Sequence, residues 1–163
     1  MAQEPEKNQN VKPVYSVSVE TNFAGLEYDE EPLLRAVYSA LRSEDCPEAE
    51  IDIILVDDDY LRELKHEYFG MDMYTDVIAF RLNPYEEGRV EGEIYISLHR
   101  AADQAEEFGV TADVELLRLV IHGTYHLLGY EDDTPDKKKI MTSKEDEQLA
   151  DFHEPLIIQK LPG

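Results

Sequence analysis

The segment over residues 111–129, TADVELLRLVIHGTYHLLG, constrains the fold more than any other part of the chain. It begins with a threonine that can cap a helix, carries acidic residues in its first turn and ends at a glycine, as helices commonly do. Its apolar residues lie nearly all round the helix axis. We therefore expect a helix that is buried in the middle of the domain, with other elements packed around it.

Four polar residues interrupt this apolar helix at steps of three or four positions. They are Glu115, Arg118, His122 and His126. Residues at that spacing share one face of a helix. The pattern predicts that this face borders a cleft or a polar network.

The sequence around this helix predicts the strands of a sheet. Residues 14–20 alternate between apolar and polar side chains, which is the period of a half-buried strand. Residues 51–56 form an apolar run that is typical of a buried strand. Two further strands are expected over residues 77–82 and 93–98.

Helices are expected between and after these strands. The predicted segments begin at Asp29, Asp57, Leu98, Thr111 and Thr134, and the last one ends before Pro155. Residues 1–13 are polar and aperiodic, so we expect a tail with no role in specifying the fold, followed by one domain over residues 14–163. The predicted fold class is α+β: a small single domain with a mixed sheet of about four strands and about five helices, with the histidine helix packed at its centre.

The composition restricts the cellular setting. Cys46 is the only cysteine, which excludes an intramolecular disulfide and a zinc cluster built from cysteines. The first residues lack an apolar core, and no apolar stretch approaches about 18 residues, so we expect neither a signal peptide nor a membrane span. A soluble, cytoplasmic protein is expected, and nothing in the sequence indicates an oligomeric state.

The charge of the chain weighs against nonspecific binding of nucleic acid. With 37 acidic and 15 basic residues, the formal net charge is −22, and the surface as a whole repels phosphate. An RNA partner would require the few cations to gather near the site. The candidates are Arg81, Arg89, Arg100, Arg118 and Lys137–Lys139.

The motif that carries chemistry is HGTYHLLGYED, from His122 to Asp132. Histidines four residues apart put two imidazoles on one helix face, where both can bind one ion. Gly129 can end the helix in the left-handed conformation, and the returning chain can then bring Asp132 beside the pair as a third ligand. Three protein ligands with a fourth position open to water are typical of a catalytic zinc site.

Other interpretations of this motif stay open. The histidines could be satisfied by neighbouring side chains, and any of the three acids over residues 131–133 could serve as the third ligand. Zinc proteases have a similar spacing, but they place a glutamate directly after the first histidine as general base. This chain has Gly123 there, which disfavours peptide hydrolysis although not hydrolysis in general.

The pattern His-Gly-x-x-His-Leu-x-Gly-Tyr over residues 122–130 resembles the motif of the YbeY family. Two upstream blocks, TDVIAF at residues 75–80 and GEI at 92–94, are similar to further blocks of that family, as are Met141 and Glu145. The resemblance implies a zinc-dependent, single-strand-specific endoribonuclease of the bacterial cytoplasm, with one zinc ion per chain, that acts in ribosomal RNA maturation and ribosome quality control. It also implies that Thr75 and Asp76 lie beside the histidine helix.

The chain departs from the family pattern at three positions. The third ligand of most members is histidine, and here it is Asp132, which zinc accepts but which adds negative charge. The family's arginine six residues before the Thr-Asp pair would fall at Phe69. The usual Gly-Asp-Ile is Gly-Glu-Ile, with Glu93 at its centre.

Three functions follow from these observations. In a metal-dependent nuclease acting on single-stranded or ribosomal RNA, Glu93 or Glu131 is the candidate for proton transfer, with the substrate's own 2′-hydroxyl as an alternative nucleophile. In a non-catalytic ribosome-assembly factor that contacts small ribosomal subunit proteins, the metal would mainly hold the loop after Gly129 in place. The acidic charge and the presence of Phe69 in place of the family's arginine favour the assembly factor. The third function is that of another metal-dependent hydrolase.

Overall fold

The computed structural model describes residues 12–161. The strands are β1 (Val14–Thr21), β2 (Glu27–Tyr28), β3 (Glu48–Val56), β4 (Val77–Arg81), β5 (Val90–Ser97) and β6 (Ile158–Lys160). The helices are α1 (Glu31–Ser43), α2 (Asp58–Phe69), α3 (Leu98–Phe108), α4 (Ala112–Leu127) and α5 (Pro135–Leu149). Within the described range no helix is long and apolar enough to cross a membrane. The predicted tail lies outside the described residues, apart from Lys12 and Pro13.

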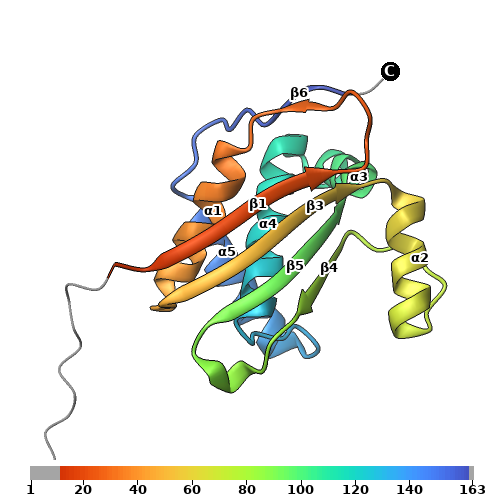
Figure 1. Cartoon of the computed structure of the whole chain (residues 1–163). Coiled ribbons are helices and arrows are strands. Elements are labelled where there is room, and N and C mark those ends of the chain that lie inside the picture. Colours follow the sequence, from red (N-terminus) through yellow and green to blue (C-terminus); the bar gives the residue numbers. More distant parts are fainter. Residues whose placement is uncertain (1–11, 162–163) are drawn as a thin grey trace, which may run out of the picture.

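Four strands form a mixed sheet in the order β1-β3-β5-β4 (Figure 1). β3 lies parallel to both β1 and β5, whereas β4 is antiparallel to β5 at the edge of the sheet. The predicted α+β class and mixed sheet are therefore confirmed. A second sheet, which pairs β2 with β6, was not predicted, because strands of two and three residues are too short to show a period.

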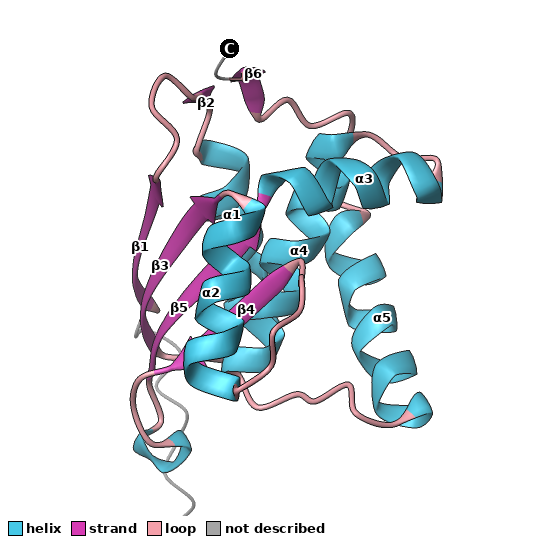
Figure 2. Cartoon of the chain, turned by 90° about the vertical axis from the view of Figure 1, so that its right-hand side faces the viewer, coloured by secondary structure: helices cyan, strands magenta, loops and turns pink. Residues whose placement is uncertain are grey.

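α4 packs at the centre of the molecule, as its apolar residues predict. It contacts β4 and β5 on the sheet side and α1, α3 and α5 on its other sides (Figure 2). Leu117, Ile121 and Tyr125 are almost completely buried. The expected position of the histidine helix is thus confirmed.

α2 covers the opposite face of the sheet. Its residue Leu61 joins Val56 and Ile78 in a separate apolar cluster, against which Phe80 and Tyr95 pack. Side chains alternate along each strand, so Ile94 on β5 faces the main core while its neighbour Tyr95 faces α2. The edge strand β4 is therefore flanked by α4 on one face and by α2 on the other.

α5 docks on the molecule mainly through polar side chains. Its buried residues are Met141, Glu145 and Gln148, of which only the methionine is apolar. The Ser39 hydroxyl donates a 2.5 Å hydrogen bond to Gln148, and the Lys144 ammonium donates one of 2.8 Å to Glu44. Hydrogen bonds thus hold this helix in position together with the apolar contacts of Met141 and Leu149.

α4 approaches the sheet closely because a glycine lies at the contact on each element, Gly123 on α4 and Gly92 on β5. A Cβ atom at Gly123 would lie 2.6 Å from Cγ2 of Ile94, and one at Gly92 would lie 2.6 Å from Cδ2 of Leu127. Any side chain at Gly123 would force the helix away from β5. The glutamate of the zinc proteases therefore has no room in this fold.

We predict that Gly123→Ala lowers the free energy of unfolding, because overpacking against Ile94 costs about 1 to 3 kcal/mol and exceeds the gain of about 1 kcal/mol in helix propensity. In the Ile94→Ala background the space is free, so the same substitution should instead stabilise the protein by up to about 1 kcal/mol. Urea denaturation of the unaltered chain, the two single variants and the double variant measures the change in the free energy of unfolding in both backgrounds. A stabilising effect of Gly123→Ala in the unaltered chain would contradict the close contact.

Candidate metal centre

Three side chains converge where α4 ends. Nε2 of His122 lies 3.0 Å from Nε2 of His126, and Oδ2 of Asp132 lies 3.3 Å from the first and 3.6 Å from the second. These atoms could hold one ion. Zinc at about 2.0 to 2.1 Å from each ligand would separate tetrahedral ligand atoms by about 3.3 Å, which matches this spacing. The donor set therefore fits a zinc-sized ion without rearrangement.

The other ring nitrogen of each histidine is held by a hydrogen bond. Nδ1 of His122 lies 2.8 Å from Oε2 of Glu145, and Nδ1 of His126 lies 2.9 Å from the carbonyl oxygen of Tyr130. A carboxylate and a carbonyl only accept hydrogen bonds, so each Nδ1 carries the proton and each Nε2 lone pair faces the centre. This arrangement is the usual support of metal-binding histidines.

The turn after α4 brings the third ligand back to the helix. Gly129 adopts a positive φ of 104°, and its N–H donates to the carbonyl of His126 while the N–H of Tyr130 donates to that of Tyr125. Gly129 thus allows the chain to reverse within a few residues, which a side chain at this φ would hinder.

Only one acid of the three in this turn faces the histidines. The carboxylates of Glu131 and Asp133 lie 3.0 and 3.2 Å from the ammonium of Lys137, on the exposed side of the turn. Asp132, between them, points to the imidazoles, as alternate side chains of an extended segment do. The structure therefore brings together His122, His126 and Asp132 and directs the neighbouring acids elsewhere.

A line of charges continues from the site along α4 and α5. The guanidinium group of Arg118 donates hydrogen bonds of 3.2 Å to Glu145 and 2.7 Å to Asp146. The carboxylate that supports His122 is therefore itself paired with a cation. Burial lowers the pKa of His122, but the hydrogen bond and charge of Glu145, together with the charges of Asp132 and Asp76, outweigh burial and the net shift is upward. Burial, followed by the neighbouring charge of His122, lowers the pKa of His126.

The remaining polar residue of the stripe, Glu115, lies in a buried and acidic environment. The residue is 3 % exposed, and burial together with the charges of Asp76 and Glu145 raises its pKa to about 7 despite the attraction of Arg118. Asp76 accepts a hydrogen bond from Gln104 and acts electrostatically on both Glu115 and His122. The structure thus places Asp76 on the same side of the sheet as the histidine helix.

The two candidates for proton transfer lie in different places. Glu93 projects from β5 on the face that carries Tyr95, whose hydroxyl donates to it at 3.2 Å, and this face packs against α2. The sheet therefore separates Glu93 from the histidines, and we assign it no role in proton transfer. Glu131 lines the same cleft as His126, although its carboxylate is paired with Lys137.

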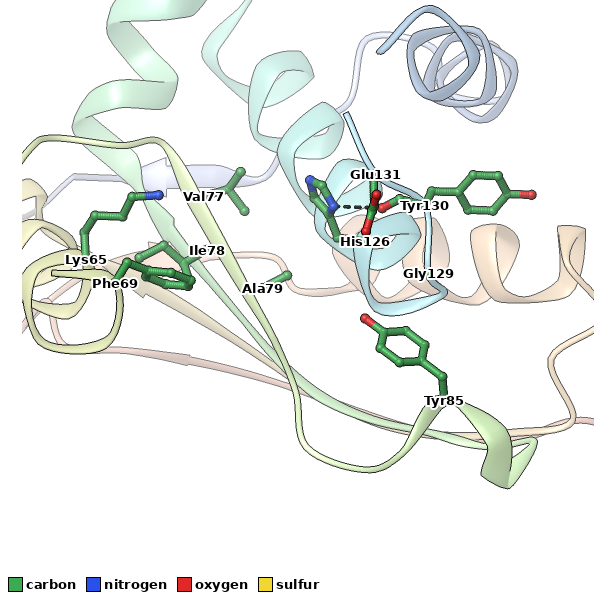
Figure 3. Close-up of a pocket in the computed structure, with 10 residues that line it drawn as sticks. All are labelled: Lys65, Phe69, Val77, Ile78, Ala79, Tyr85, His126, Gly129, Tyr130 and Glu131. Atoms are coloured by element: carbon green, nitrogen blue, oxygen red, sulfur yellow. Dashed lines mark hydrogen bonds between the residues drawn. The ribbon is translucent and has the colours of Figure 1, made fainter. Parts of the chain in front are cut away.

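That cleft, of about 560 Å³, crosses the free edge of β4 (Figure 3). Lys65 and Phe69 of α2 form one wall, and His126 and the turn after α4 form the other. Residues 77–79 lie between the two walls, and Tyr85 closes one side. The histidine site therefore opens onto a groove that is large enough for an extended ligand.

Most of the cations proposed to gather at the site are already bound to other groups of the protein. Arg89 pairs with Glu87 and Glu91, and Arg100 pairs with Asp58. Arg81 donates to the carbonyl oxygens of Leu127 and Arg89 and so ties β4 to the end of α4. Arg118 and Lys137 are also paired with acids. Of the predicted cations, Lys138 and Lys139 are therefore the two without an ion pair or side-chain hydrogen bond among the described residues.

Sequence reasoning left several residues of the site without a role. Glu145 was noted only for its resemblance, although Met141, Glu145 and Gln148 recur at the spacing of one buried helix face, and a glutamate on such a face indicates a polar partner. Lys65 belongs to no local motif, and the role of Tyr130 lies in its backbone carbonyl, which the identity of a residue does not indicate.

The fold and the site together define a class: a small α+β protein in which a buried helix and the turn after it form a three-ligand candidate metal centre beside a cleft. A family model described as endoribonuclease YbeY matches residues 18–153. The chain belongs to the YbeY family, and the resemblance drawn from the motifs is confirmed.

Individual relatives match over most of their length. The endoribonuclease YbeY of Flavobacterium psychrophilum is 40 % identical over 125 residues, which cover 77 % of this chain and 88 % of the relative. That of Lysinibacillus sphaericus is 39 % identical over 145 residues, covering 82 % and 91 %. A solution structure of a Thermotoga maritima protein superposes with a TM-score of 0.55 at 28 % identity, over 82 % of this chain and 86 % of that one.

We predict that Asp132→Ala lowers zinc affinity by more than the roughly 10- to 100-fold that is typical for loss of a supporting hydrogen bond, because a direct ligand is removed. Glu131→Ala and Asp133→Ala are matched controls that should bind zinc nearly as well as the unaltered chain, and Asp132→His should retain the metal. Competition with a chromophoric chelator measures the affinities. Full zinc content in Asp132→Ala together with loss in Glu131→Ala would refute the ligand set.

We also predict that Glu145→Gln lowers zinc affinity about 10- to 100-fold, because the amide can still accept from Nδ1 of His122 but no longer carries the negative charge. Asp146→Asn is the control, since Asp146 pairs with the same Arg118 but touches neither histidine. The same competition assay applies. If both substitutions weaken zinc binding equally, the effect comes from the loss of charge pairing with Arg118 and not from support of the imidazole.

Proposed function

We propose that the protein is a zinc-dependent endoribonuclease that cleaves single-stranded RNA, acting in the cytoplasm in ribosomal RNA maturation and ribosome quality control. One observation carries the proposal: two imidazole Nε2 atoms and one carboxylate oxygen converge at 3.0 to 3.6 Å, while both Nδ1 atoms are held by hydrogen bonds. Membership of a family whose members are named endoribonucleases supports RNA as the substrate.

His122, His126 and Asp132 would hold the ion, and two nitrogen ligands with one carboxylate suit the borderline preference of zinc. Bound zinc would supply a Lewis acid for the hydrolysis of a phosphodiester. Three protein ligands would leave the ion accessible to the reacting groups. The side chains of His122 and His126 are 21 % and 30 % exposed, so the site is reachable from the cleft.

The other residues of the site orient and prepare the ligands. Glu145 fixes the ring of His122, and the carbonyl of Tyr130 fixes that of His126. Glu131 is our candidate for moving a proton, because it lines the cleft beside His126. The ion pair of Glu131 with Lys137 would have to open for that role. The nucleophile would be water or, alternatively, the 2′-hydroxyl group of the substrate itself.

A second function is favoured by the charges of the molecule. The net charge is −22, and the guanidinium groups of Arg89, Arg100 and Arg118 are all paired with acids. A non-catalytic assembly factor that contacts small ribosomal subunit proteins would need no strong field for RNA. In that case the metal would serve to hold the turn after Gly129 against α4.

We predict that the zinc-loaded protein cleaves a single-stranded RNA and that His122→Ala lowers both the zinc content and the cleavage rate, the latter by at least about 100-fold, because the Lewis acid is lost. His153→Ala, which changes an exposed histidine outside the site, should alter neither. Elemental analysis and gel-resolved cleavage of a labelled oligoribonucleotide measure the two effects. Stoichiometric zinc without cleavage by the unaltered chain would exclude the nuclease and favour the assembly factor.

A further inference from the structure

The wall of the cleft that faces the metal centre contains one cation. Among the residues that line the cleft, Lys65 is the only lysine or arginine, and Glu131 is an acid on the opposite wall. Asp132 adds a second negative charge at the edge of the site. Lys137 offsets the charge of Glu131, and a bound ion would offset that of Asp132, so Lys65 is the cation among the lining residues that can contact an entering phosphate on the α2 wall.

The ammonium of Lys65 is available to a ligand. In the range from residue 12 to residue 161, no acid forms an ion pair with it, whereas Arg62 on the same helix is paired with Asp72. Lys65 differs in this from Arg118 and Lys137 beside the metal centre, which are both paired with acids. Pairing would neutralise the charge, so its absence leaves the charge for a ligand.

An aromatic platform holds this lysine in place. Nζ of Lys65 lies 4.8 Å from the ring centroid of Phe69, one turn further along α2, which is a cation–π distance. The ring of Phe69 in turn stacks on Phe80 of β4 at 6.0 Å and 16°, so the platform is fixed to the sheet. Pre-ordering matters, because fixing a free lysine side chain costs up to about 2 kcal/mol of rotamer entropy.

We propose that Lys65 binds a backbone phosphate of single-stranded RNA in the cleft, and that Phe69 is its positioning residue. This inference rests on the proposed function, because it assigns the cation that brings the substrate to the metal centre. The strand would cross the edge of β4, with one phosphate at Lys65 on the α2 wall and the chain continuing toward His126 on the opposite wall (Figure 3).

The test measures the affinity of the zinc-loaded protein for a fluorescein-labelled oligouridylate with 2′-O-methyl groups, by fluorescence anisotropy at several salt concentrations. Lys65→Gln should weaken binding about 10-fold, and the slope of log K against log salt should become shallower by about 0.7, the value for one phosphate contact on a single strand. Lys65→Arg should keep the slope. Lys160→Gln, the same charge change on β6 outside the cleft, should leave both quantities unchanged.

Phe69 is tested separately from folding. Phe69→Leu keeps an apolar contact with Phe80 but removes the ring, so it should weaken RNA binding several-fold with an unchanged salt slope, because the charge of Lys65 remains. Phe69→Trp should bind as well as the unaltered chain, and it introduces the only tryptophan, whose fluorescence should change when RNA enters the cleft. Phe108→Trp, at the exposed end of α3, is the control that should not respond.

The outcomes separate this inference from the function on which it rests. If the unaltered chain binds and cleaves RNA while Lys65→Gln keeps the full salt slope, the role of Lys65 is wrong and the nuclease stands. If Phe69→Leu binds RNA as tightly as the unaltered chain, the positioning role is wrong. If the unaltered chain neither binds nor cleaves RNA, both the nuclease and the assignment of Lys65 fall. Unchanged zinc content and thermal unfolding in all variants exclude an indirect effect.

Discussion

The burial of α4 is the constraint on which the rest of the structure depends. This helix is apolar nearly all round, so it needs the sheet on one side and three helices on the others, and the domain supplies both. Its polar stripe then has to be satisfied inside the molecule, because unpaired buried polar groups are costly. Glu145 and the turn after Gly129 meet that need, and in doing so they orient two imidazoles toward one point.

The electrostatics of the site follow from this arrangement of charges. Arg118 neutralises Glu145, Glu145 supports His122, and Lys137 draws Glu131 and Asp133 away from the centre. Each pairing removes a cation from the set that could attract RNA. Arg118 and Lys137, the two candidate cations beside the site, are thus committed to acids of the protein, and substrate attraction has to come from residues on another element.

The sequence predicts the features that depend on local period and misses those that depend on distant contacts. The buried helix, the strands and the histidine pair follow from spacing within a few residues. The sheet face on which Glu93 lies also follows from spacing. Ile94 belongs to the main core, and adjacent side chains of a strand point to opposite faces, so Glu93 lies on the face away from the histidine helix. The block similarity that suggests Glu93 as a candidate for proton transfer takes no account of this alternation. The pairing of Arg118 with Glu145, 27 positions later, has no local signal, because it depends on how α5 packs.

The polar contacts of α5 couple the position of this helix to ligand binding at the histidine site. Only one of its buried side chains is apolar, and one of its polar contacts is the support of His122. Occupation of the histidine site and seating of α5 are therefore linked equilibria, in which whatever favours one favours the other by the same free energy. The far end of the helix, where Gln148 meets Ser39, extends this linkage to α1, a second helix that packs on α4. We expect the amide protons of α5 to exchange more slowly when the centre is occupied.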